Sequence, residues 1–510
     1  MDAVEVELKF QVPAAKRAAV RKAVATAGAR SVRLQAVYLD TADQRLAAAG
    51  LALRLRKEGP RWVQTLKGRG DGLMQRLEHE VALPAQRGRP QPDPARHAGT
   101  AVGARLAALL ADGTPLQERY GTDIQRLLRR VRTGGATVEL AFDSGHITAA
   151  GLRQPVCEVE FELVAGPPQP LLALAARWVQ RHGLWLDVRT KSERGHRLAL
   201  GVHEVPATGA APVLLRAAHT PGQALGAVLQ AALAQMLPNA AELGNGCGTP
   251  EHLHQLRVGL RRLRSALRLL APWAGDADVA RALEQAWRGP FRQLGALRDA
   301  DVVAQLLQQA GAVEGAPRHA VAAPAAAATA EADGAAAVVR HPEFSVLVLR
   351  SLRLALDASM LPAPDHPSAT PAGSPADAAA RLLRPAWRRA RRDGQAFAAA
   401  SPEQRHRLRR QLKRLRYTLE FLQPLLRRKS AARALEALRA ALDALGASND
   451  ALLAQAQLQA AVAQGTADAA TWWALGWLAA QQDRLQRRAA RQLARLPAAW
   501  PRAKSLSADR

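Results

Sequence analysis

Charged side chains occupy every second position in several apolar runs of this chain. In VEVELKF, near the N-terminus, Glu5, Glu7 and Lys9 alternate with Val, Leu and Phe. Because successive side chains of a β-strand point to opposite faces, the three charges share one face and the apolar residues share the other. Carboxylates on such a face can bind a divalent cation, and Lys or Arg can bind phosphate oxygens. The run therefore combines two chemistries that a phosphate-binding metal site needs.

The same alternation recurs along the first 200 residues. Carboxylates gather on the first strand and on a late one, and cations gather on the strands between them. These strand-face charges are Glu5, Glu7, Lys9, Arg54, Arg56, Lys67, Arg76, Glu78, Glu80, Asp143, Glu158, Glu160 and Glu162. For any one strand, a sheet with its charges in water is the simpler interpretation. The separation of acids from bases favours a closed barrel with inward charges, neutralised by Mg²⁺ and a phosphate chain.

An ordered set of motifs resembles the CYTH-type triphosphate tunnel metalloenzymes. The set is ExExK at 5–9, YLDTAD at 38–43, LRLRK at 53–57, a strand ending in Lys67, RLEHE at 76–80, ELAFDSG at 139–145, CEVEFEL at 157–163 and TKSERG at 190–195. The resemblance covers about residues 1–200. It implies an eight-stranded antiparallel tunnel that hydrolyses, or in some members cyclises, a triphosphate with Mg²⁺ or Mn²⁺.

The resemblance also implies a role for each matching residue. Glu5, Glu7, Glu158 and Glu160 would bind the metal or orient the attacking water, and with Lys9 they form the predicted catalytic set. Phosphate would be bound by Lys9, Arg54, Arg56, Lys67 and Lys191, with support from Asp143 and Glu162. Arg126 is a further phosphate candidate, although Arg129 and Arg130 compete for its register. His79 and His146 are interpreted as ordinary strand or turn residues, because the chemistry needs no nucleophile.

Inorganic triphosphate is the preferred substrate, with hydrolysis to diphosphate and phosphate. The segment 84–120 offers no aromatic set before Tyr120 that would hold a nucleobase. A triphosphatase acting on thiamine triphosphate or nucleotides is an alternative. So is a non-catalytic scaffold that binds polyphosphate or nucleic acid.

The second half of the chain is rich in Leu, Ala and Arg, which predicts helices. Two of these predicted helices carry a basic stripe. The stripe residues advance by three and four positions, so each set lies along one side of its helix. The first stripe is His254, Arg257, Arg261, Arg264 and Arg268, and the second is His406, Arg409, Lys413, Arg416 and Glu420. Residues 253–275 include no acid, which predicts an uncompensated positive surface. Each helix is followed by a predicted turn, LGALRDADV at 294–302 and LGASNDALL at 445–453, which indicates an internal duplication.

This pattern resembles the CHAD domain over about residues 215–510. The resemblance implies that inorganic polyphosphate binds where the two stripes form a common groove. His254 and His406 would donate to phosphate or orient their neighbours rather than bind a metal. Asp299, Asp301 and Asp450 would either hold the cations in register or cap helices.

Composition sets the frame for these predictions. The fold class is α+β with two domains: an antiparallel eight-stranded β tunnel with flanking helices at 1–202, a linker at 203–218, and an all-α duplicated helical bundle at 219–510, with repeats at about 219–358 and 377–500. Ala/Pro-rich stretches at 311–339 and 359–376 are predicted loops. The net charge of +27 favours polyanionic partners, and the 4% aromatic content argues against nucleic acid.

The expected location is the cytoplasm, without a membrane span. Only Cys157 and Cys247 are present, and no apolar stretch reaches the length of a span. Because the resemblance to the CHAD domain implies polyphosphate binding, association with polyphosphate granules is a further hypothesis. The sequence makes no prediction of oligomeric state.

Overall fold

A computed structural model describes residues 3–70, 72–86, 88–216, 218–317, 333–361 and 375–501. The chain forms two compact units. The first unit comprises residues 1–208, 236–253 and 336–353, and the second comprises 209–235, 254–335 and 354–510. Segments of three long helices therefore belong to the same unit as the N-terminal half of the chain.

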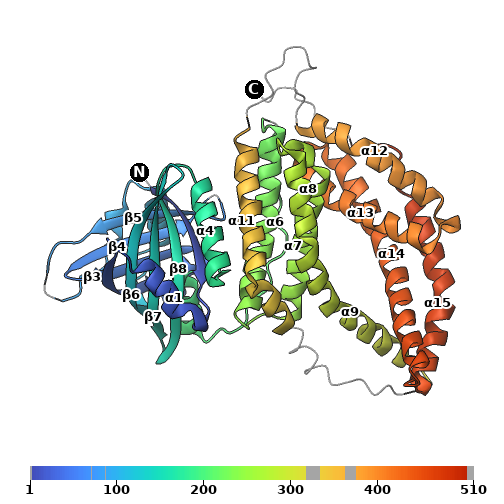
Figure 1. Cartoon of the computed structure of the whole chain (residues 1–510), viewed down its shortest axis with the longest axis horizontal. Helices are drawn as coiled ribbons and strands as arrows, with labels where there is room; N and C mark the ends of the chain where they lie inside the picture. The colour runs from blue at the N-terminus through green and yellow to red at the C-terminus, as the bar shows by residue number, and fades with distance from the viewer. Residues whose placement is uncertain are drawn as a thin grey trace, which may run out of the picture. The chain divides into compact units, whose positions relative to one another are not determined.

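The first unit is built on a closed antiparallel barrel, as predicted. Strand order is β5-β4-β3-β2-β6-β7-β8-β1, and pairing of β5 with β1 closes the ring. The strands are β1 (Ala3–Gln11), β2 (Arg30–Asp40), β3 (Leu51–Glu58), β4 (Arg61–Arg69), β5 (Gln75–Ala82), β6 (Gln117–Thr133), β7 (Ala136–Ala149) and β8 (Leu152–Ala165). A two-residue strand, β9 (Trp185–Leu186), pairs with Phe10 and Gln11 at the end of β1. Figure 1 shows the strands curving around one another, with α1 and α4 beside them.

Tight turns set the register of the longest strands. Ala149 pairs with Leu152, so only Ala150 and Gly151 connect β7 to β8, and both have positive φ. Such a turn matches the right-handed twist of the strands that it joins. The resulting register places Asp143 opposite Glu158, so their side chains share one face.

The apolar core of the barrel lies on its outside, because the charged faces point inward. Leu53, Leu55 and Leu66 pack with Leu106 of α3 into one buried cluster. On another side, the Trp178 ring meets the Phe161 ring edge to face. The flanking helices are α1 (Arg17–Val24), α2 (Arg45–Ala48), α3 (Ala101–Leu109), α4 (Gln169–His182) and α5 (Lys191–Leu200).

The second half of the chain is helical, as predicted. Its helices are α6 (Pro221–Gly244), α7 (Pro250–Leu269), α8 (Ala277–Ala286), α9 (Arg288–Gly311), α11 (Pro342–Ser359), α12 (Pro375–Gln395), α13 (Pro402–Leu422), α14 (Arg428–Ala463) and α15 (Ala469–Ala494). Capping boxes at Ser401 and Asp468 fix the first residues of α13 and α15. Across the described residues, no helix combines the length and the apolar character that a membrane crossing requires.

Two local predictions in this half are wrong. The segments 294–302 and 445–453 are not turns, because they lie inside α9 and α14. Their Leu and Ala residues are strong helix formers, which outweigh one Gly and a few Asn or Asp residues. Within the predicted loop 311–339, residues 333–340 are helical. The stretches 318–332 and 362–374 lie outside the described residues.

Candidate active site

The barrel encloses a charged cavity of about 400 Å³. Side chains from strands all around the ring line it, together with the first turn of α5. The predicted residues among them are Glu5, Glu7, Lys9, Arg54, Arg56, Lys67, Arg126, Asp143, Glu160, Glu162 and Lys191. The alternation in the sequence therefore identified the inward faces correctly.

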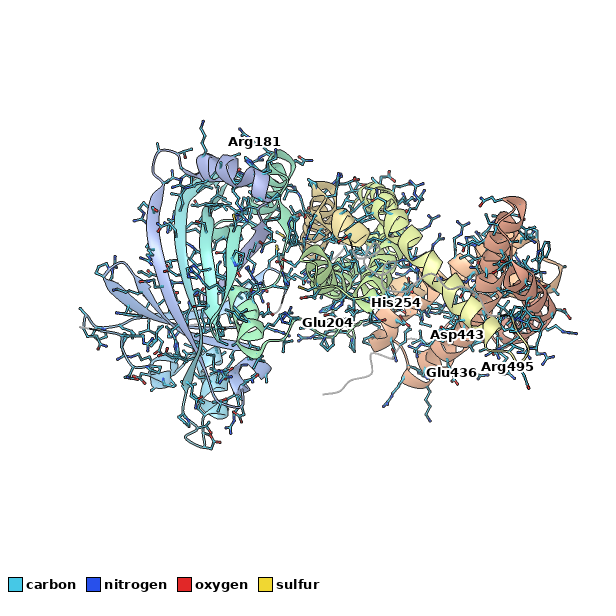
Figure 2. The ribbon with its side chains drawn as sticks, turned by 90° about the horizontal axis from the view of Figure 1, so that it is seen from below. Arg181, Glu204, His254, Glu436, Asp443 and Arg495 are labelled. Atoms are coloured by element: carbon cyan, nitrogen blue, oxygen red, sulfur yellow. The ribbon has the colours of Figure 1, made fainter. Side chains whose placement is uncertain are left out.

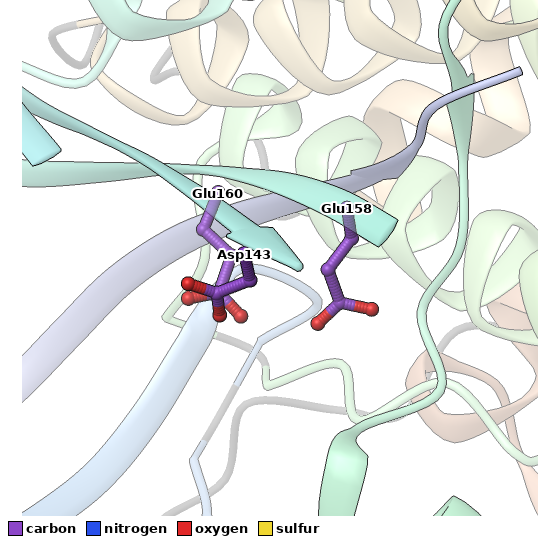
Figure 3. Close-up of side chains that lie close together, drawn as sticks. All are labelled: Asp143, Glu158 and Glu160. Atoms are coloured by element: carbon purple, nitrogen blue, oxygen red, sulfur yellow. The ribbon is translucent and has the colours of Figure 1, made fainter. Parts of the chain in front are cut away.

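Three carboxylates form a compact cluster on β7 and β8. One oxygen from each of Asp143, Glu158 and Glu160 lies within 4.8 Å of the other two. Figure 3 shows the three side chains pointing to the same side of the sheet. Asp143 and Glu158 are fully buried. This oxygen-rich cluster has the donor type that a hard divalent cation prefers.

Lys191 lies among these three carboxylates. Its Nζ is 2.7 Å from Asp143 Oδ2, 2.5 Å from Glu158 Oε1 and 2.8 Å from Glu160 Oε1. The Thr190–Glu193 capping box begins α5 at this point and so fixes the position of the lysine. Burial alone would lower the pKa of Lys191, but the three carboxylates outweigh it and raise the pKa well above its ordinary value.

Two arginines complete the neutralisation of the cluster. Arg126 bonds both oxygens of Asp143 at 2.7 and 2.6 Å and reaches Glu160 at 2.5 Å. Arg194 bonds Glu158 at 2.8 Å. Burial opposes ionisation of Glu160, but Lys191 and Arg126 together hold its pKa well below the ordinary value. Three cations, Lys191, Arg126 and Arg194, therefore pair with the three carboxylates.

Glu5 lies in a second group, with Lys67 and Glu78. Lys67 Nζ is 2.8 Å from a carboxylate oxygen of each glutamate. Burial and a hydrogen bond with Glu78 raise the pKa of Glu5 to about 8, while Lys67 helps to hold that of Glu78 at about 2 against the effect of burial. Burial thus favours the protonated form of Glu5, whereas Lys67 favours the ionised form of Glu78.

The other predicted residues line the wall in separate ion pairs. Glu7 lies 3.7 Å from Arg76, and Arg54 lies 3.6 Å from Glu78. Arg56 bonds Glu80 at 3.0 Å. Lys9 donates through Nζ to the carbonyl oxygen of Arg189. The cavity thus brings together the predicted tunnel residues except Glu158, which is buried beside it, and Glu5 and Glu7 lie outside the three-carboxylate cluster.

The sequence reasoning missed several members of this site. Arg194 was not chosen, although it follows Lys191 by three positions and therefore lies on the same side of α5. Arg76, Glu78 and Glu80 were recognised as strand-face charges but were given no role in binding. Tyr38 and Tyr120 also line the cavity, with ring centroids 4.6 Å apart, and Tyr38 accepts a hydrogen bond from Arg54. Tyrosines in strand-like runs carried no signal that distinguished them from core residues.

Two histidines lie outside the cavity, in agreement with their predicted structural role. His79 bonds His97 through their Nδ1 atoms at 2.9 Å, and His97 Nε2 lies 3.0 Å from the Gln64 side chain. His146 contacts Arg153.

The second unit brings the two basic stripes close to each other. Arg261 of α7 donates to the Tyr417 hydroxyl of α13 at 3.5 Å, and the Arg262 guanidinium stacks over the Phe421 ring. Burial, Arg261 and Arg409 together lower the pKa of Lys413 to about 6, so these three cations lie within electrostatic range. The middle parts of α7 and α13 therefore lie close together, and a common groove between the two stripes stays a prediction.

The first stripe is not wholly uncompensated, contrary to the prediction for residues 253–275. Arg264 forms an ion pair with Glu284 of α8 at 2.6 Å. Arg416 lies 3.9 Å from Glu420 on the same helix. Arg268 and His406 are exposed, and His254, labelled in Figure 2, is half-buried on α7. Glu284 lies on a different helix from Arg264, so the absence of acids within residues 253–275 did not reveal this ion pair.

The segments that were expected to be turns contact the stripes from neighbouring helices. Arg257 Nη2 lies beside Gly295 of α9, and Arg409 Nη2 lies beside Gly446 of α14; a Cβ on either glycine would be 3.5 and 3.6 Å from the guanidinium nitrogen, respectively. Asp450 lies in mid-helix, so it caps nothing, and its charge favours the ionised forms of Arg409 and Lys413. The side chains of Asp299 and Asp301 lie outside the described residues. The matching contacts of Arg257 and Arg409 support the predicted duplication.

Comparison with known proteins divides the chain in the same way. Residues 3–195 match the CYTH domain family, and residues 227–459 match the CHAD domain family. An inorganic triphosphatase from Haemophilus influenzae is 30% identical over 168 residues, which span 32% of this chain and 44% of that relative.

Two solved structures are also similar. The CHAD domain from the plant Ricinus communis is 29% identical, with 58% of this chain and 99% of that chain covered and a TM-score of 0.46. A putative adenylyl cyclase from Hippeastrum, described as having a dominant triphosphatase activity, is 17% identical, with 39% and 96% covered and a TM-score of 0.29.

Proposed function

Because the chain combines a CYTH domain with a CHAD domain, we propose that its tunnel is a metal-dependent enzyme that hydrolyses inorganic triphosphate to diphosphate and phosphate. One observation carries the proposal: a cavity inside the barrel is lined by a set of cations and by Asp143 and Glu160, two members of the three-carboxylate cluster. The similarity to an inorganic triphosphatase supports the choice of substrate.

Asp143, Glu158 and Glu160 fit a divalent ion. Their oxygens are close enough to share one cation, and all three are hard donors. Glu158 Oε1 is buried and makes no hydrogen bond, although Lys191 lies beside it. Glu5 and Glu7 are proposed as further ligands or as the groups that orient the attacking water. A bound Mg²⁺ or Mn²⁺ would offset negative charge on the phosphoryl group.

The charge balance of the cavity supports metal dependence. Cations and carboxylates line the wall in nearly equal numbers, so the wall by itself offers little net attraction to a polyanion. An added divalent ion would make the cavity electropositive. The cavity residues would then exchange carboxylate partners for phosphate oxygens.

The cations would hold the phosphate chain and stabilise charge as the bond breaks. Arg54, Arg56 and Arg126 present planar forks that match phosphate oxygens, whereas Lys9, Lys67 and Lys191 act as point charges. Their burial in the barrel excludes bulk water, which strengthens each contact. Water attack in line with the leaving diphosphate then needs positioning and electrostatic stabilisation rather than a protein nucleophile.

Phosphate release from tripolyphosphate, with Mg²⁺ and with a chelator, tests the proposal. The parent chain should be active only with the metal. Glu160→Gln should reduce kcat by about 100-fold or more, since even residues that support metal ligands typically contribute 10- to 100-fold. Glu204→Gln is the matched control, because Glu204, labelled in Figure 2, is exposed and does not line the cavity. Equal rates in parent and Glu160→Gln would refute the enzymatic role. Comparing kcat/KM for tripolyphosphate, ATP and thiamine triphosphate tests the substrate.

We propose that α7 and α13 bind inorganic polyphosphate. The convergence of Arg261, Arg409 and Lys413 supports this, because neighbouring cations can bind several phosphate oxygens of one chain together. Filter binding of labelled polyphosphate and single-stranded DNA at matched salt tests it. Polyphosphate should bind more tightly, and Arg261→Gln should weaken it, whereas Arg433→Gln, on the exposed side of α14, should not. A preference for DNA would contradict the proposal.

A further inference from the structure

Asp187 is the centre of a buried hydrogen-bond network in the first unit. Its carboxylate is fully buried and accepts bonds from the backbone and the side chain of Arg189. It also accepts from Gln11 Nε2 and Asn245 Nδ2, both at 3.1 Å. Burial alone would raise its pKa, but Arg189 and Lys9 outweigh that effect and keep the pKa below its ordinary value. Asp187 is therefore a charged, fully bonded group that lies beside the tunnel but does not line it.

One side of this network reaches two residues of the proposed active site. Gln11 Nε2 donates to Glu158 Oε2 at 3.3 Å as well as to Asp187, so the amide bridges the two carboxylates. The Asp187 amide donates to the Lys9 carbonyl at 3.1 Å, and Lys9 Nζ donates to the Arg189 carbonyl. These hydrogen bonds connect both Lys9 and Glu158 to the buried Asp187 network.

The other side of the network consists of the end of α6 and the turn after it. Asn245 bonds Asp187, and Glu242 lies 3.6 Å from Arg189 and 2.7 Å from Arg197. Both residues belong to the segment 236–253 of the first unit, yet they lie within the part of the chain that matches the CHAD family. A segment outside the CYTH match therefore supplies partners to residues behind the tunnel.

We propose that Asp187 is a positioning residue of the tunnel and that Asn245 and Glu242 complete its support, so that the CHAD-matched segment helps to place Lys9 and Glu158. This inference rests on the proposed function of the tunnel. Removing a donor to Asp187 lets its carboxylate move toward Gln11, which shifts Glu158 and weakens metal binding. Partners of ligands typically change metal affinity by 10- to 100-fold.

The test uses the full chain and three near-isosteric variants. Asp187→Asn removes the charge, and Asn245→Leu removes the donor. Asn239→Leu is the matched control, because Asn239 is also a buried residue of α6 and its side chain bonds the backbone of Thr208. Calorimetric titration with Mn²⁺ in the absence of substrate, melting temperatures and crystal structures are measured for all four proteins.

Asp187→Asn and Asn245→Leu should weaken Mn²⁺ binding by about 10-fold or more, and their structures should show Lys9 and Glu158 displaced. Asn239→Leu should lower the melting temperature without changing Mn²⁺ affinity. If Lys9 and Glu158 keep their positions and Mn²⁺ affinity is unchanged, the positioning role is refuted. If even the parent chain fails to bind Mn²⁺ but the side chains still move, the proposed function fails while the positioning role stands.

Discussion

Lys191 pairs with the three clustered carboxylates inside the tunnel. Its side chain is only 12% exposed and lies within 2.8 Å of an oxygen of each clustered carboxylate. Taking several charges out of water is unfavourable unless each one is paired. The ammonium group thus occupies the place among the carboxylates that a metal ion would also favour.

Lys191→Met should destabilise the protein and make its stability depend on the metal. The variant leaves buried carboxylates without their shared cation, which should cost about 3–5 kcal/mol of unfolding free energy. Urea denaturation should show that added Mg²⁺ recovers more stability in the variant than in the parent, because the ion replaces the ammonium. Lys57→Met, on the exposed end of β3, is the control and should change neither quantity. An equal response to Mg²⁺ in variant and parent would contradict the assigned metal cluster.

Lys413 should couple polyphosphate binding to proton uptake. Burial and the nearby charges of Arg261 and Arg409 lower its pKa to about 6, so most molecules carry a neutral amine at pH 7.5. Bound phosphate favours the ammonium and raises that pKa, so the complex holds more protons than the free protein. Affinity should therefore fall as the pH rises above about 6. Calorimetry in buffers of different ionisation enthalpy measures the uptake, and Lys413→Met should abolish most of it.

Hydrogen bonds of Gln64 and His79 hold the short helix Pro94–His97 against the barrel. Gln64 can donate to His97 Nε2, which leaves the His97 Nδ1 hydrogen to bond His79. Gln64 also bonds both backbone groups of Asp93. Burial and the neighbouring His79 lower the pKa of His97 to about 4.

Acid should weaken this contact. The pKa of His97 is lower in the folded state than in the unfolded chain, so the stabilising effect is complete above about pH 6.5 and is lost as the pH falls toward 4. The loss should be on the order of 2 kcal/mol. Hydrogen exchange at the Asp93 amide should accelerate at pH 4.5, beyond the intrinsic effect of pH, in the parent but not in His97→Leu. The same protection in parent and variant at both pH values would refute this interpretation.

The helices α9 and α14 illustrate where local signals mislead. Gly, Asn and Asp in LGALRDADV and LGASNDALL are typical of turns, yet both segments are helical. In α14, Ala451, Ala454 and Leu458 pack into a cluster with residues of α9 and α15. Tertiary packing of an apolar side stabilises a helix more than a few weak formers destabilise it. Gly295 and Gly446 accordingly mark contacts with arginines rather than chain reversals.

The first compact unit extends beyond the predicted tunnel domain of residues 1–202. Leu186 donates through its amide to Ser345 Oγ at 2.9 Å, and Arg340 bonds the Gly244 carbonyl. The Trp185 ring lies against Gly244, where an added Cβ would come within 2.8 Å of it. The domain boundaries at residues 202 and 219 stay a prediction from the sequence. The folded unit also includes the segments 236–253 and 336–353.

A chain that ends at residue 203 should therefore be less stable than the full protein. Exposing Trp185 and Leu186 and removing two partners of the Asp187 network should cost about 3 kcal/mol or more. Calorimetry should show the melting transition of the barrel lowered by about 6–12 °C. Equal melting temperatures for the barrel in both chains would show that the helical segments contribute nothing to it.

The alternation of charged and apolar residues in the strands predicted which side chains share a face of the tunnel wall. A β-strand has a side-chain period of two by covalent geometry, so the sequence alone showed that Glu158 shares a face with Glu160 and that Arg54 shares one with Arg56. Helical periodicity likewise placed Arg261 and Lys413 on stripes. These relations are local, and no distant part of the chain can change them.

Only the tertiary structure decided which of these faces meet. Closure of β5 on β1 places the charges inside, and the register of β7 with β8 selects Asp143, rather than Glu5 or Glu7, as the third member of the carboxylate cluster. The partners Arg194, Asp187 and Asn245 come from helices and turns far along the chain. Such pairings depend on register, closure and packing, which are set by long-range burial and are not encoded in the spacing of any one segment.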